Sequence, residues 1–97
     1  MKEKEKLKTY LESYGGIIST FEDLEPDKDF ELSMAYVERL ELEDNKDKLS
    51  KNELEELKRY DQIALETYEK VKHLDMPIVD WLKDIVSIIN GKIPFRV

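Results

Sequence analysis

Apolar residues recur along most of the chain at the spacing of amphipathic helices rather than at the alternation of strands. The pattern predicts helices at 3–14, 28–43, 51–74 and 77–90, plus a short helical turn near 20–25. Short links between these segments favour an antiparallel bundle. We therefore expect an all-α fold of about four helices with an extended C-terminal tail. The length of 97 residues allows one domain, covering residues 1–97.

Local signals mark the ends of the first and third helices. Gly15 and Gly16 predict the end of the first helix, because glycine readily takes the left-handed conformation found there. Ser50 is followed three residues later by Glu53, a spacing typical of a capping box. The third helix is therefore expected to begin directly after Ser50.

The segment 28–43 carries two competing patterns. Phe30, Met34, Val37 and Leu40 lie at helical spacing and would form an inward stripe. Apolar residues also alternate with others in the first half of the segment, as in a strand. The residue types favour a helix, and no second strand is available for pairing. We predict a helix with this stripe in the core.

The segment 77–90 has the clearest amphipathic pattern in the chain. Its apolar residues fill about half of a helical wheel, and its polar residues fill the opposite arc. Asp75 is expected to be the N-cap, with Pro77 in the first turn. Asn90 and Gly91 are expected to end the helix.

Composition narrows the class of protein. Cysteine is absent, so disulfides and thiolate metal sites are excluded. The charged N-terminal residues are not followed by an apolar run, so no signal peptide is expected. The apolar stretch 78–89 is interrupted by charges and is too short to span a bilayer. We expect a cytoplasmic protein with no membrane association. Abundant lysine and glutamate also hint at a heat-adapted source.

The net charge of −7 is concentrated in one segment. Residues 17–49 carry eleven acidic and four basic side chains. Such a segment repels phosphate backbones, so nucleic-acid binding is disfavoured, whereas a basic protein surface is a compatible partner. An alternative is an acidic inhibitor that imitates nucleic acid for a DNA- or RNA-binding protein.

No pattern in the chain predicts catalytic, cofactor-binding or metal-binding residues. His73 is the only histidine, and one histidine cannot build the paired motifs of di-metal bundles. Residues 27–38 match the acidic spacing of a calcium loop, but Leu32 replaces the glycine that its sharp turn requires. We therefore expect a protein without enzymatic activity and without a cofactor.

Asp61 stands out because it falls inside the apolar face of the predicted helix 51–74. A carboxylate in this position needs a partner or an open groove, because its burial alone is costly. One interpretation pairs it with Arg39, Arg59 or a tyrosine hydroxyl. The other makes it the centre of a cleft in a ligand-binding or enzymatic domain.

Ile63 and Leu74 lie opposite the main apolar stripe of the same helix. Together with Val79, Trp81 and Val86 of the last helix, they form the predicted interaction surface. The function favoured by the sequence is a non-catalytic protein–protein interaction module, such as a small accessory subunit or homodimeric adaptor. Its partner would be another protein or a second copy of the chain.

Overall fold

The computed structural model describes residues 2–19 and 28–91. In chain order, they form α1 (Lys2–Ser19), α2 (Lys28–Asp44), the 3₁₀ helix η1 (Lys46–Lys48), α3 (Lys51–Val71) and α4 (Pro77–Ile89). No strand occurs within these ranges, so the predicted all-α bundle is confirmed and the strand interpretation is wrong. The predicted turn at 20–25 and the C-terminal tail lie outside the described residues.

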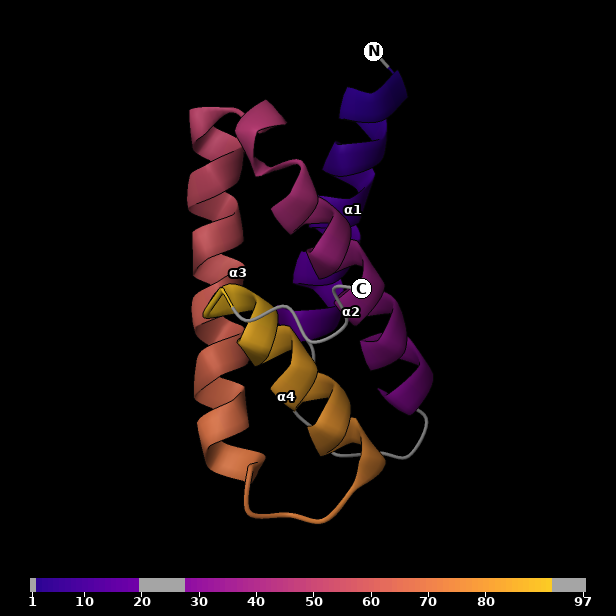
Figure 1. The fold of residues 1–97 in the computed structure, drawn as a ribbon, viewed down its shortest axis with the longest axis vertical. Coiled ribbons are helices and arrows are strands. Elements are labelled where there is room, and N and C mark those ends of the chain that lie inside the picture. Colours follow the sequence, from indigo (N-terminus) through magenta and orange to yellow (C-terminus); the bar gives the residue numbers. More distant parts are fainter. Residues whose placement is uncertain (1, 20–27, 92–97) are drawn as a thin grey trace.

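Figure 1 shows the arrangement of the helices. They pack around one apolar core. Most contacts between helices join α1 to α2, α2 to α4, α4 to α3 and α3 to α1. Each helix therefore has two main neighbours, and α2 and α3 face each other across the centre of the bundle. A side chain on the inner face of α2 can consequently reach one on α3.

The prediction that α1 ends at Gly15 and Gly16 is wrong, because the helix continues to Ser19. Gly15 is buried against α3, and a Cβ added there would overlap the ring of Tyr60. The absence of a side chain thus serves close helix packing rather than a helix end. The extra turn also carries Ile18 into the core.

The predicted start of α3 is confirmed by a complete capping box. The Ser50 hydroxyl accepts a hydrogen bond from the Glu53 backbone N–H at 3.2 Å, and the Glu53 carboxylate accepts one from the Ser50 backbone N–H at 2.8 Å. The helix ends three residues earlier than expected, at Val71. Its last turn is closed by the Lys72 N–H, which donates to the Tyr68 carbonyl at 2.8 Å.

At α4, the predicted extent is nearly right but the predicted N-cap is wrong. Met76, in an extended conformation, holds the N-cap position in place of Asp75, and no side chain bonds the helix start. Pro77 opens the first turn, where its missing N–H costs no helical hydrogen bond. Asn90 and Gly91 end the helix as expected, with Gly91 at a φ of 81°.

Burial along α4 anchors the core. Its six buried side chains are Ile78, Val79, Leu82, Ile85, Val86 and Ile88. Burial of each large apolar side chain contributes about 1.5–3 kcal/mol. Within the described ranges, no helix is long and apolar enough to cross a membrane.

Candidate functional site

The outer face of α2 carries an apolar stripe that the described part of the chain leaves exposed. Phe30, Met34 and Val37 are 72%, 40% and 56% exposed, respectively. They lie at i, i+4 and i+7 and so share one side of the helix. The prediction that these residues face the core is therefore wrong. We name Phe30, Met34 and Val37 the outer stripe.

The inner face of α2 is formed instead by a second set of residues at helical spacing. Leu32, Ala35, Tyr36 and Leu42 are buried there, and so is Arg39, which is 1% exposed. The hydrophobic pattern treats arginine as a surface residue. The prediction based on this pattern therefore placed the wrong face of α2 in the core.

A buried ion pair explains why α2 turns this face inward. Arg39 donates to Asp61 through Nε, at 2.9 Å from Oδ1, and through Nη2, at 2.8 Å from Oδ2. Turning the outer stripe inward would bury one set of apolar side chains in place of another, with a similar gain in hydrophobic stabilisation. It would also strand the Asp61 carboxylate, at a cost of about 3–5 kcal/mol. The ion pair therefore decides the orientation.

The same network includes Tyr14 on α1 and Glu43 on α2. The Tyr14 hydroxyl donates to Asp61 Oδ1 at 2.7 Å, and Arg39 Nη1 donates to Glu43 Oε1 at 3.0 Å. Burial, reinforced by the charge of Asp61, raises the pKa of Tyr14 well above its usual value. Tyr14 consequently stays protonated and remains a hydrogen-bond donor.

Arg39 keeps its charge inside the protein. Burial is the largest influence on its pKa and lowers it, but the hydrogen bonds and charge of Asp61 outweigh burial and raise the pKa above its usual value. Both oxygens of Asp61 thus accept hydrogen bonds from groups of the chain itself. The structure brings Asp61 together with Arg39 and a tyrosine hydroxyl, two of the partners considered from the sequence.

A cleft of about 310 Å³ does lie beside Asp61. Its other lining residues are Leu54, Leu57, Lys46 and Lys58. Both Asp61 oxygens already accept hydrogen bonds from Arg39 or Tyr14, so a ligand in this cleft would compete with these donors.

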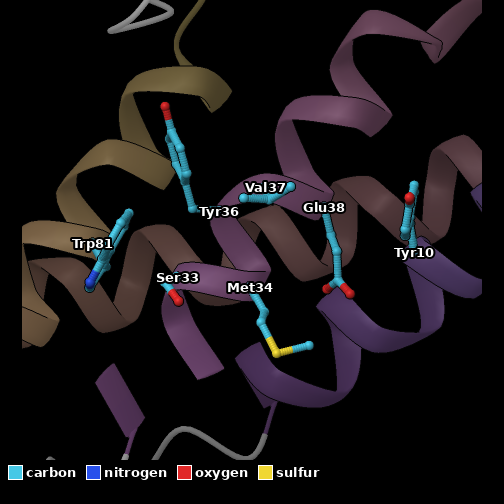
Figure 2. A pocket seen from close by; sticks show the side chains of 7 residues that line it. All are labelled: Tyr10, Ser33, Met34, Tyr36, Val37, Glu38 and Trp81. Carbon is cyan, nitrogen blue, oxygen red and sulfur yellow. The ribbon is translucent and has the colours of Figure 1, made fainter. Parts of the chain in front are cut away.

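A larger apolar pocket, of about 390 Å³, adjoins the outer stripe (Figure 2). It is lined by Tyr10 of α1, by Ser33, Met34, Tyr36, Val37 and Glu38 of α2, and by Trp81 of α4. The rings of Tyr36 and Trp81 pack with their centroids 5.6 Å apart, joining α2 to α4 beneath the stripe. The pocket is open and continuous with the exposed side chains of α2.

Glu38 is a buried carboxylate in the lining of this pocket. The side chain extends from α2 toward α1, as Figure 2 shows, and its residue is 8% exposed. Ser13 of α1 hydrogen-bonds the carboxylate, but within the described part of the chain Oε1 has no hydrogen-bond partner. Burial raises the pKa of Glu38, and the Ser13 hydrogen bond only partly offsets this effect.

One carboxylate of α4, Asp84, acts electrostatically on Tyr36 in the pocket lining. Burial is the main cause of the raised pKa of Asp84, and the charge of Asp80 adds to it. Burial likewise raises the pKa of Tyr36, and Asp84 reinforces the shift.

The predicted interaction residues are mostly engaged within the bundle. Val79 and Val86 are buried, whereas Ile63, Leu74 and Trp81 are partly buried and pack against the core. Trp81 alone among them lines the pocket beside the outer stripe. The structure therefore gathers one of the five predicted residues at the exposed apolar surface.

His73 is exposed just after α3, and the described residues include no group of three His, Cys, Asp or Glu side chains that could hold a metal ion.

No family model, curated protein or solved structure matches the chain. The interpretation of the site consequently rests on its own geometry.

Proposed function

We propose that this protein is a non-catalytic protein–protein interaction module that docks its partner on the outer stripe of α2. One observation carries the proposal: Phe30, Met34 and Val37 form an exposed row on a helix whose opposite face is already buried. A helix that is apolar on two sides is normally covered on both.

The arrangement of the exposed residues supports this interpretation. Single apolar side chains on a surface are ordinary and need no explanation. The outer stripe is different, because three large apolar residues are aligned and continue into the pocket of about 390 Å³. A contiguous apolar surface of this kind is typical of a binding site.

The proposal moves the interaction surface from the one expected from sequence. Ile63, Leu74, Val79 and Val86 contribute mainly to the core, so α2 takes over the docking role, with Trp81 at its edge. The acidic segment that contains α2 is compatible with a basic partner, and complementary charge would steer the encounter. We place the module in the cytoplasm, in keeping with its lack of cysteine.

The two alternative functions are less well supported. A cleft enzyme centred on Asp61 would need a carboxylate available to a ligand, but Arg39 and Tyr14 engage it. A nucleic-acid mimic would need rows of open carboxylates. Within the described part of α2, Glu38 is buried and Glu43 is bound to Arg39.

Site-specific photo-crosslinking tests the docking role. Benzoylphenylalanine is placed at Val37 in cells that naturally produce the protein, and the matched control carries it at Gln62, an exposed position on α3. We expect a covalent adduct with another polypeptide from position 37 and none from position 62. Equal adducts from both positions, or no adduct from position 37, would refute the proposal.

A further inference from the structure

Glu38 occupies an unusual place for a carboxylate. It is 8% exposed at the edge of the outer stripe, and within the described chain its Oε1 accepts no hydrogen bond. Leaving a buried acceptor without a donor costs about 1–3 kcal/mol, and more when the group is charged. Asp61 shows the contrasting arrangement, because three donors of the chain itself satisfy it. Glu38 thus supplies an unsatisfied acceptor to the pocket lining. Because Oε1 has almost no exposed surface, a bound molecule reaches it only when the Glu38 side chain turns toward the pocket.

The charges around the stripe have one predominant sign. From Phe30 to Asp44, the sequence has five acidic side chains and one basic side chain, Arg39. Arg39 is buried and bound to Asp61, so it contributes no positive charge to the outer face. On α1, the exposed Lys6 lies one helical turn before Tyr10, so a positive charge shares that side of the helix.

We propose that the outer stripe and Glu38 together bind an amphipathic helix of a partner protein, which places apolar side chains on Phe30, Met34 and Val37 and directs an arginine or lysine to Glu38. This inference rests on the proposed function and adds the chemistry of the partner. A cationic donor satisfies Oε1, and its charge-assisted hydrogen bond is stronger than a neutral one.

A helix is the occupant that fits this surface best. The outer stripe repeats at i, i+4 and i+7, the spacing that a partner helix matches with apolar anchors of its own. A second copy of the chain is disfavoured by charge. It would bring another net charge of −7 to the interface, and the described outer face of α2 from residue 30 to 44 offers no exposed basic group to Glu38.

The test uses the full chain and three designed 18-residue helical peptides without tryptophan. All three carry the same leucine stripe, and their remaining positions are basic, neutral or acidic. Trp81 is the only tryptophan of the protein and lines the pocket, so its emission reports binding there. We expect the basic peptide to bind most tightly. Its affinity should fall as the salt concentration rises, because salt screens exposed charges. The acidic peptide should bind most weakly.

A pair of variants isolates the carboxylate. Glu38→Gln should weaken binding of the basic peptide by about tenfold or more while changing binding of the neutral peptide less than about twofold. Glu55→Gln removes the same charge from an exposed position of α3 and should change neither peptide by more than about twofold. Circular dichroism confirms that both variants remain helical.

The outcomes separate this inference from the proposed function. Equal binding of basic and neutral peptides, or equal effects of Glu38→Gln and Glu55→Gln, would overturn the role of Glu38. The crosslink at Val37 could still stand in that case. A crosslinked product of twice the chain mass would instead identify a second copy as the occupant and overturn the basic-helix inference. Loss of the crosslink itself would refute the docking role.

Discussion

Helices α2 and α4 lie side by side but use their apolar residues differently. In α4, six apolar side chains are buried, and its exposed positions are Pro77, Asp80 and Lys83. In α2, apolar side chains occupy both faces, and the inner one also holds Arg39. The orientation of α4 follows from its hydrophobic pattern, whereas that of α2 follows from an ion pair with α3.

The difference shows what a hydrophobic stripe can and cannot establish. A stripe identifies a surface that avoids water, but it does not say whether the same chain covers that surface. In α2, the inward side is set by the need of Asp61 for the Arg39 guanidinium. The outer stripe is then left exposed by the described part of the chain.

The largest expected effect comes from breaking the ion pair. Arg39→Met should lower the free energy of unfolding by about 3–5 kcal/mol, because it leaves the Asp61 carboxylate buried without its main donor. Urea denaturation followed by circular dichroism measures this loss. The double variant Arg39→Met with Asp61→Leu should recover much of it. A single-variant cost no greater than that of Lys58→Met, at an exposed position, would contradict the role given to the pair.

A second pair of variants compares the two helices directly. Leu82→Ala should cost about 2–5 kcal/mol, because it opens a cavity in the core under α4. Val37→Ala on the outer stripe should change stability by no more than about 0.5 kcal/mol. Chemical denaturation of both variants gives the two values. Similar losses at the two positions would break the contrast between the helices.

Substitutions of two adjacent glycines test how closely α1 must approach α3. This approach brings Tyr14 of α1 to Asp61 of α3. Gly15→Ala should destabilise the protein by about 1–3 kcal/mol, because its Cβ would overlap Tyr60. Gly16→Ala should instead raise stability by up to about 1 kcal/mol, since the new Cβ meets nothing within 4 Å and alanine favours a helix. Thermal unfolding of both variants distinguishes the packing effect from helix propensity. A stabilising Gly15→Ala would show that α1 and α3 can move apart freely.

The smallest effect concerns the pH dependence contributed by Glu38. Because burial raises its pKa above the usual 4.5, the folded protein holds this proton more tightly than the unfolded chain. The stabilisation from Glu38 is complete below that usual value and is lost as pH rises through the raised pKa. Relative to Glu38→Gln, the wild type should therefore lose free energy of unfolding as pH rises through this interval. The loss should be no more than about 1 kcal/mol. Urea denaturation of both proteins measures the difference. It is repeated at pH values from about 3.5 to about 7, in steps of about half a unit. A parallel pH dependence in the two proteins would contradict the assignment.

The helices themselves were well predicted because their signals are local. The capping box at Ser50 and the end of α4 at Gly91 each depend on a few neighbouring residues. The α4 core face was also evident, because its polar residues all fall on the opposite arc. By contrast, the end of α1 depended on Gly15, whose role is set by Tyr60 on another helix.

The candidate site was harder to predict, because its position depends on partners that are distant in sequence. Asp61 was recognised as an acid that needed a partner, and Arg39 was among the candidates. Taking the two together would have turned α2 by half a circle and exposed Phe30, Met34 and Val37. The burial of Glu38 against α1 had no comparable signal, since a glutamate in a charged helix is usually solvated.

The carboxylates that border the outer stripe also affect how the protein behaves when concentrated. At neutral pH, a net charge of −7 opposes contact between copies, each of which exposes Phe30, Met34 and Val37. Near the isoelectric point of about 4.8, this repulsion disappears while the apolar row remains. Acidic buffers should thus favour precipitation, and neutral, low-salt buffers should preserve monodisperse samples for crystallisation or NMR spectroscopy.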